Sequence, residues 1–316
     1  MFLTNLFKKL LYQKVKPVSI DEIEKVYVIN LERSQDRKVV CMQMLYENFG
    51  DKFLNQKIED VFFIATDGAK DLVIEPQNDK LKTNIIYDSR DSDLKLKQTD
   101  KKVYSVKYGT RRFTNKMTKG EIGATLSHFR AYYDIVKNNY KYGIIFEDDF
   151  VFNPVPSSDK PYNFYYNLQQ ALNNAPKDFD ILKLDTRSLK LLQENKDNLK
   201  PLAKIKHFFK YGYNKYWVNC NCVLHMSGAY AYIISQKGAR KIIKFLQEKT
   251  LYREWTTDTF FYTILVKKFH FDKTYIIKHS LFGITYVPSV VDDIEERKIA
   301  KKAKKKGVSY LLPKEN

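Results

Sequence analysis

The sequence predicts an α/β protein built on a parallel sheet. Residues 25–65 read as a strand, a helix and a second strand within about forty residues, which is a βαβ unit. Residues 118–146 read as a capped amphipathic helix that leads into a short apolar strand. Because parallel strands need a crossover, usually a helix, these two observations together indicate the fold class.

In the first unit, residues 25–31 (KVYVINL) and 61–65 are the apolar runs that predict buried strands. Ser34 can cap the helix between them, since its hydroxyl can accept a hydrogen bond from a backbone N–H of the first turn. The helical positions expected to face inward are Val40, Cys41, Met44 and Leu45. Residues 69–116 are charged and show no sustained hydrophobic period, so we expect a long flexible loop there.

The segment 118–149 contains the strongest local pattern. Thr118 and Glu121 have the spacing of a capping box. One apolar helical face is predicted for Ile122, Leu126, Phe129, Tyr133 and Val136. After a turn, an apolar strand at residues 144–146 ends in three successive acids, Glu147, Asp148 and Asp149.

Three adjacent carboxylates at a strand end are costly, because each raises the pKa of its neighbours. A bound divalent cation removes that cost, and hard oxygen ligands suit Mg²⁺ or Mn²⁺. The location is also suitable, since open α/β sheets bind ligands beyond the carboxyl ends of their strands. The sequence therefore predicts a metal site here; the alternative is a solvated acidic turn.

Further elements follow downstream. We expect helices at residues 162–174 and after Ser235, and strands at residues 180–185, 222–224, 229–234 and 275–278. Asp258 lies among aromatic residues, which can raise the pKa of a carboxyl and suit it to act as a base. The alternative for Asp258 is an ordinary acid at a helix N-terminus. His279 follows a strand and is a further candidate metal ligand, although an isolated histidine is more often structural.

Composition narrows the class of partner. The chain has 316 residues with 55 Lys and Arg against 37 Asp and Glu, a net charge of +18, which favours anionic partners. No apolar run is long enough to span a membrane, and no cleavable signal peptide is evident, which favours a cytoplasmic location. Residues 1–16 are amphipathic and residues 297–306 are strongly basic, so both termini are candidates for peripheral contact with an anionic membrane.

Three segments resemble glycosyltransferase family 25. They are GEIGATLSHFRAY with GIIFEDD at residues 120–149, INLERSQDR with ATDG at residues 29–68, and GAYAYIISQKGARKII at residues 228–243. The resemblance implies a GT-A-type fold, with a mostly parallel central sheet and helices on both faces. It also implies an inverting transfer of a hexose, galactose being favoured, from a UDP-sugar to a hydroxyl of a glycan, glycolipid or hydroxylysine-type acceptor, with a lipooligosaccharide-type acceptor favoured.

The resemblance also implies roles for particular residues. The donor site would contain Asn30, Arg33, Arg37, Asp67, Glu121, Glu147 and Asp148. Asp149 would bind Mn²⁺ or Mg²⁺, with Asp148 and His279 as further ligands, and Asp258 would be the catalytic base. Arg33 and Arg37 are assigned to the diphosphate because a guanidinium fork matches phosphate oxygens; the alternative is that they pair with Glu32 and Asp36.

The expected organisation is an amphipathic segment at residues 1–20, a transferase domain at 21–290 and a basic tail at 291–316. Two other classes remain open. A basic nucleic-acid-binding protein would explain the charge, although the basic residues follow no recognised nucleic-acid motif, so we expect no specific nucleic-acid partner. A catalytically silent carbohydrate-binding relative is the other, against which the intact EDD sequence argues.

Overall fold

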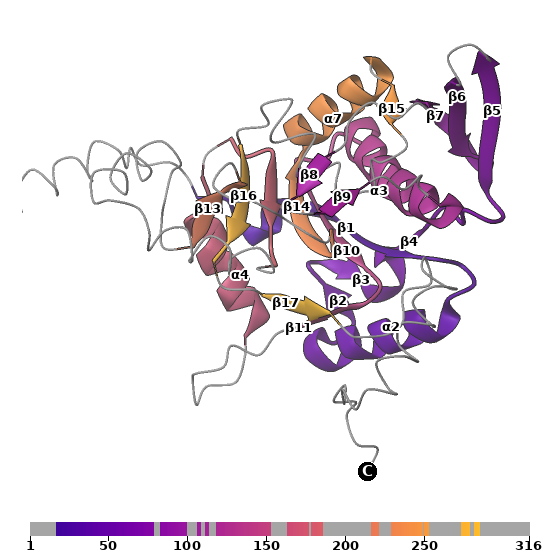
Figure 1. The fold of residues 1–316 in the computed structure, drawn as a ribbon. Coiled ribbons are helices and arrows are strands. Elements are labelled where there is room, and N and C mark those ends of the chain that lie inside the picture. The colour runs from indigo at the N-terminus through magenta and orange to yellow at the C-terminus, as the bar shows by residue number, and fades with distance from the viewer. Residues whose placement is uncertain are drawn as a thin grey trace, which may run out of the picture.

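The computed structural model describes residues 17–78, 83–99, 106–108, 111–113, 118–152, 163–176, 178–185, 216–220, 229–248, 250–252, 273–278 and 281–284. Its centre is a seven-stranded mixed sheet (Figure 1). In spatial order the sheet contains β13 (Trp217–Asn219), β16 (Thr274–Ile277), β12 (Ile181–Lys183), β14 (Ala231–Ser235), β10 (Tyr142–Glu147), β1 (Ile23–Asn30) and β4 (Phe62–Ile64).

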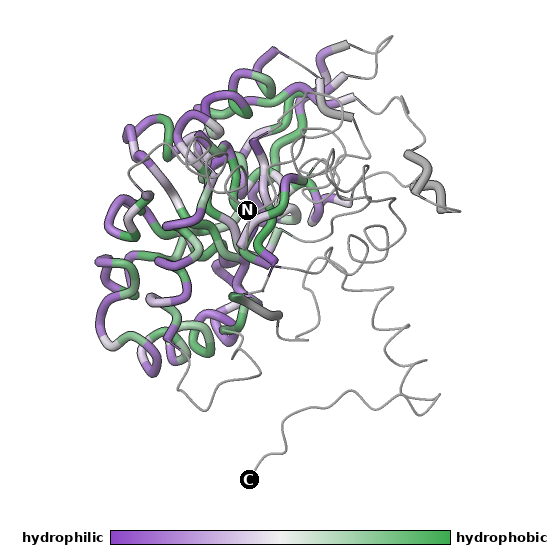
Figure 2. The backbone as a smooth tube through the Cα atoms, turned by 90° about the vertical axis from the view of Figure 1, so that its left-hand side faces the viewer, coloured by the Kyte–Doolittle hydropathy of each residue, from purple (hydrophilic) through white to green (hydrophobic). Residues whose placement is uncertain are grey.

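Helices cover both faces of this sheet. One face carries α3 (Lys119–Lys137) and α7 (Gln236–Glu248), and the other carries α2 (Gln35–Phe49) and α4 (Phe164–Asn173) (Figure 1). Alternation along β1 assigns Tyr27 and Ile29 to the first core and Val26 and Val28 to the second. The hydrophobic segments accordingly run through the interior, with hydrophilic segments on the outer surfaces of the helices (Figure 2).

The prediction of an α/β fold with helices on both faces is confirmed, but the sheet is only half parallel. Strand β1 pairs in parallel with β10 and β4, and β12 with β16. Three other pairs are antiparallel: β10 with β14, β12 with β14, and β13 with β16. Two of these pairs arise from β14, which runs between β10 and β12 in the opposite direction to both, and the third from β13 at the edge of the sheet.

Residues 72–78 and 83–99, part of the predicted loop 69–116, are not a loop. They form β5 (Leu72–Asn78), β6 (Thr83–Asp88) and β7 (Asp91–Thr99), an antiparallel meander that β15 (Leu251–Tyr252) joins to make a four-stranded sheet. Buried Ile86, Leu94 and Leu96 pack into the core that contains α3 and α7. The charged residues that hid this pattern lie on the exposed face of β7, where every second side chain points to solvent.

Short elements complete the described chain. They are the 3₁₀ helices η1 (Ile20–Glu22) and η2 (Ile58–Val61) and the strand pairs β2 (Lys52–Phe53) with β3 (Gln56–Lys57), β8 (Val106–Tyr108) with β9 (Arg111–Phe113), and β11 (Phe150–Phe152) with β17 (Phe282–Ile284). Among the described helices, none combines the length and the apolar composition that crossing a membrane requires.

Most local predictions are confirmed, with two exceptions on α2. The capping box at Thr118 is formed, and the Ser235 hydroxyl accepts a hydrogen bond from the Gly238 N–H at 3.1 Å. Ser34 occupies the N-cap position of α2 but makes no side-chain cap bond. Val40 is predicted to face inward but is 62% exposed, because the inward face of α2 is the one that carries buried Cys41 and Leu45, with Met44 packed against the same core. Residues 222–224 lie outside the described part of the chain.

Candidate active site

The parallel pairing of β4, β1 and β10 brings the predicted site residues to one edge of the sheet. Asn30 ends β1, Glu147 ends β10, and residues 65–71 follow β4. The amide of Asn30 donates a hydrogen bond to the Asp148 carboxylate at 2.8 Å, although the two residues are 118 positions apart. Sequence-distant donor-site candidates are therefore direct neighbours at this carboxyl edge.

The two arginines of the first loop have different environments. Arg37 Nη1 donates to Asp148 Oδ1 at 2.7 Å, and both side chains are nearly buried, at 10% and 11% exposure. Arg33 Nε donates to Asp67 Oδ2 at 2.7 Å, but the Arg33 side chain is 52% exposed. Each arginine thus pairs with a predicted site carboxylate, and in neither case with the alternative partner, Glu32 or Asp36. The exposed Arg33 is the better placed of the two to meet an anionic ligand.

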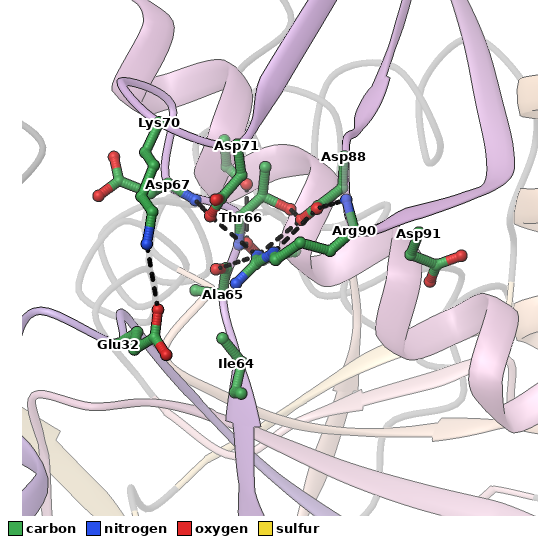
Figure 3. Close-up of polar contacts among 12 residues, drawn as sticks. Glu32, Ile64, Ala65, Thr66, Asp67, Lys70, Asp71, Asp88, Arg90 and Asp91 are labelled. Carbon is green, nitrogen blue, oxygen red and sulfur yellow. Dashed lines mark hydrogen bonds and ion pairs between the residues drawn. The ribbon is translucent and has the colours of Figure 1, made fainter.

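Asp67 is held in its ionised form. Burial raises the pKa of this carboxyl, but hydrogen bonds from the Ala69 N–H and the Arg33 guanidinium outweigh that effect and bring the pKa below its usual range. A second ion pair, Lys70 with Glu32 at 3.5 Å, joins the same two loops at the exposed rim of the site (Figure 3).

Asp149 has the opposite electrostatic character. Burial, with the nearby charges of Glu147 and Asp148, raises the pKa of this carboxyl to about 7. A divalent cation at Asp149 would offset this repulsion, so the chemistry of the residue fits a metal. Within the described part of the chain, however, no three acidic, histidine or cysteine side chains converge as a ligand set. A cation held here would rely on one or two carboxylates, with phosphate and water oxygens completing its shell.

A buried chain of polar side chains, which the sequence reading missed, supports Glu147. His128 Nε2 lies 3.2 Å from Glu147 Oε1, and His128 Nδ1 lies 2.7 Å from the Tyr232 hydroxyl. The Tyr232 and Tyr132 hydroxyls are 2.6 Å apart. Burial raises the pKa of both tyrosines well above their ordinary value, so both keep their protons. One arrangement satisfies all four groups: Tyr132 donates to Tyr232, Tyr232 to His128, and His128 to the Glu147 carboxylate.

Glycines allow the start of α3 to approach the loop after β4. A Cβ on Gly68 would lie 1.9 Å from the Lys119 carbonyl oxygen, and one on Gly123 would lie 2.5 Å from the Thr66 carbonyl oxygen. The Ser127 hydroxyl accepts a hydrogen bond from the Thr66 N–H at 2.8 Å. The GEIG and LSH segments therefore fix the backbone that carries Asp67.

Three more residues complete the comparison with the sequence. Glu121 accepts a hydrogen bond from the Thr118 N–H at 2.6 Å, which assigns it a capping contact, while its role at the donor stays a prediction. Asp258 and His279 lie outside the described residues. The sequence also did not predict the ion pair at the end of β12, where Lys183 Nζ and Asp185 Oδ2 are 3.2 Å apart and both side chains are buried.

A mixed sheet between helical layers, with an acidic strand end at its carboxyl edge, defines a GT-A-like α/β protein. Residues 23–261 match the family model described as glycosyltransferase family 25 (LPS biosynthesis protein). The chain belongs to glycosyltransferase family 25.

Curated relatives agree with this assignment. Procollagen galactosyltransferase 1 of Danio rerio is 23% identical over 74% of this chain, and a glycosyltransferase 25 family member of Aedes aegypti is 28% identical over 72%. Procollagen galactosyltransferase 2 of Homo sapiens is 22% identical over 73% of this chain. The matched part covers 31%, 29% and 29% of the length of these three relatives, respectively.

Proposed function

We propose that this chain is an inverting glycosyltransferase that moves a hexose, with galactose favoured, from a UDP-sugar to a hydroxyl of a glycan or glycolipid acceptor. The observation that carries the proposal is the junction at the carboxyl edge, where Asn30 at the end of β1 donates to Asp148 and Arg33 in the loop after β1 pairs with Asp67. Family membership and the similarity to procollagen galactosyltransferases support galactose as the sugar. A lipooligosaccharide-type acceptor is favoured over a hydroxylysine-type one, since the family description refers to LPS biosynthesis.

In the proposed reaction, an acceptor oxygen forms a bond to the anomeric carbon as the bond from that carbon to the UDP oxygen breaks. Asp67 accepts hydrogen bonds from the nucleoside, and Arg33 donates to the diphosphate. Glu147, held in place by His128, orients the sugar. Asp148, held in place by Asn30 and Arg37, lies next to Glu147 and lines the same side of the proposed donor site. A divalent cation at Asp149 would supply positive charge to the departing diphosphate.

We assign Asp258 as the base that takes the proton of the acceptor hydroxyl, because the resemblance places an aspartate at this position. The Asp258→Asn variant should then keep its donor affinity and lose turnover, as measured by donor titration and initial rates. Weaker donor binding with unchanged turnover would instead assign Asp258 to the donor site.

The proposed function is tested by thermal unfolding with a panel of UDP- and GDP-sugars, each with and without Mn²⁺. One UDP-hexose should raise the midpoint most, since a ligand at about 100 times its Kd stabilises the native state by about 2.7 kcal/mol. Addition of EDTA should remove most of that shift. Stabilisation by oligonucleotides but by no nucleotide sugar would contradict the proposal, and binding without transfer or hydrolysis would favour a silent relative.

The buried tyrosine chain gives a second expectation. Tyr232→Phe removes the hydroxyl that contacts His128 Nδ1, so the ring that donates to Glu147 loses a contact that orients it, and turnover should fall by about 10- to 100-fold, as is usual for such outer contacts. Tyr27→Phe is the matched control: it removes a hydroxyl that donates to Asp134, also on α3, at 2.7 Å. Equal initial rates for the two variants would show that the buried contacts among Tyr132, Tyr232 and His128 have only a structural role.

A further inference from the structure

We propose that Asp88 and Arg90, at the turn between β6 and β7, are positioning residues of the donor site. They fix residues 65–71, the loop that follows β4, and through that loop they fix Asp67. The inference rests on the proposed function, in which Asp67 binds the nucleoside of the donor. It also gives the β5–β7 meander a role, since its turn is the part that meets this loop.

Asp88 is the centre of the contact. Its side chain is fully buried, and its carboxylate accepts hydrogen bonds from the Thr66 hydroxyl at 2.7 Å, from Arg90 Nη2 at 2.8 Å and from Arg130 Nη1 at 2.9 Å. These donors come from the loop after β4, from the meander itself and from α3. Burial raises the pKa of Asp88, but the hydrogen bonds from Arg90 and Thr66 outweigh it and lower the pKa to about 2. The carboxylate is therefore ionised throughout the neutral range.

Arg90 links Asp88 to the backbone of residues 65–71 (Figure 3). Its Nη2 atom donates to the Ala65 carbonyl oxygen at 2.8 Å and lies 3.0 Å from Asp71 Oδ2. The same Asp71 oxygen accepts a hydrogen bond from the Asp67 N–H at 3.0 Å. A continuous path thus runs from Arg90 through Asp71 to the backbone of Asp67.

The backbone of the β6–β7 turn adds a contact that does not depend on Arg90. The Ser89 N–H donates to the Asp71 carbonyl oxygen at 2.8 Å. Removing the Arg90 guanidinium would leave this bond in place, and Asp88 would keep Arg130 as a cationic partner. We therefore expect Arg90 variants to fold while residues 65–71 lose their fixed geometry.

The test compares Arg90→Gln and Arg90→Lys with a control near the start of β7, close to Arg90 in the sequence. Asp93→Asn is that control: Asp93 also joins the meander to α3, through Lys137 at 3.0 Å, but both side chains are more than half exposed and neither contacts the loop. Amide hydrogen exchange of residues 66–71 reports loop order without any ligand. Affinity for the best-binding UDP-hexose, with kcat at donor saturation, reports function.

Arg90→Gln should speed exchange in residues 66–71 and weaken donor affinity, each by about tenfold or more, which is the worth of a hydrogen bond to a charged group. Its kcat at saturation should stay within a few-fold of the unsubstituted protein, because the chemistry lies at other residues. Arg90→Lys, which keeps the charge but loses the planar fork, should show smaller changes in the same direction. Asp93→Asn should change neither quantity.

Two results would overturn the inference alone. Unchanged exchange in residues 66–71 would show that Arg90 does not order the loop. Faster exchange with unchanged donor affinity would show that the loop does not position the donor. Failure of the proposed function is distinguishable, because the unsubstituted protein would then bind no nucleotide sugar at all. That result would also contradict the donor role of Asp88 and Arg90.

Discussion

Replacing Asp149 with asparagine should abolish turnover and remove the Mn²⁺ dependence of donor binding, while the protein stays folded. The Asp149 carboxyl is the group that would meet the cation at the end of β10, and a neutral amide is a far weaker ligand for Mn²⁺ or Mg²⁺. Initial rates and donor titrations with and without Mn²⁺ measure both effects. Retained metal-dependent donor binding in this variant would remove Asp149 from the metal site.

The same substitution should make the metal-free protein more stable at high pH. The pKa of Asp149 rises from an ordinary 3.8 to about 7 in the folded chain, so between these values the native state binds a proton that the unfolded state has lost. Stability therefore falls as pH rises through this window and stays low above it. Since one pKa unit corresponds to 1.36 kcal/mol, the total cost is of order 4 kcal/mol, and Asp149→Asn removes it.

Urea unfolding in EDTA at pH 4.5 and pH 8 measures this stability effect. The two proteins should differ by only about 1 kcal/mol at the lower pH, which lies about 0.7 units above the ordinary pKa of 3.8, and the asparagine variant should be more stable by several kcal/mol at the higher pH. A variant that is less stable at pH 8 would mean that the ionised carboxylate makes favourable contacts in the folded state, and that a cation is not needed to offset its burial.

What the sequence predicted well is local. The capping box of Thr118 and Glu121 and the strand before Glu147 depend on neighbours within a few residues, and both formed as expected. The parallel pairing of β1 with β10 and β4 followed from the βαβ pattern. The direction of β14 did not, because strand order and direction depend on pairings between segments far apart in the chain.

In the candidate active site, too, local features were predictable from the sequence and long-range contacts were not. The motifs placed Asn30, Asp67 and Asp148 at strand ends, and the sheet brings those ends together. Partner choice was beyond the sequence: Arg37 had Glu32 and Asp36 as near neighbours, yet it pairs with Asp148, 111 residues away. The His128 contacts and the Asp88 network were missed for the same reason, since most of their partners are distant in the sequence: Tyr232 and Glu147 for His128, and Thr66 and Arg130 for Asp88. Isolated polar residues on apolar helix faces, such as His128, were the one available signal.

Arg37 should be needed for stability, whereas Arg33 should be needed for donor binding. Replacing Arg37 with methionine leaves the Asp148 carboxylate nearly buried beside Glu147 and Asp149 without its cation. Removing one partner of a buried ion pair costs about 3–5 kcal/mol, and we expect a loss near the lower limit because Asn30 still donates to Asp148. Arg33→Met is the control: the Arg33 side chain is half exposed, and the nearly buried Asp67 keeps its hydrogen bond from the Ala69 N–H, so the stability change should be only about 1 kcal/mol.

A double substitution distinguishes two causes of the lost stability: the missing packing of the Arg37 side chain, and the Asp148 charge left without its cationic partner. In Arg37→Met with Asp148→Asn, the buried charge is gone together with its partner, so urea unfolding in EDTA should show most of the lost stability recovered. If the single and double variants are equally unstable, the cost arises from packing of the Arg37 side chain rather than from Asp148. Donor titrations should rank the variants differently, with Arg33→Met the weaker binder despite its near-normal stability, because its exposed guanidinium is the one that meets the diphosphate.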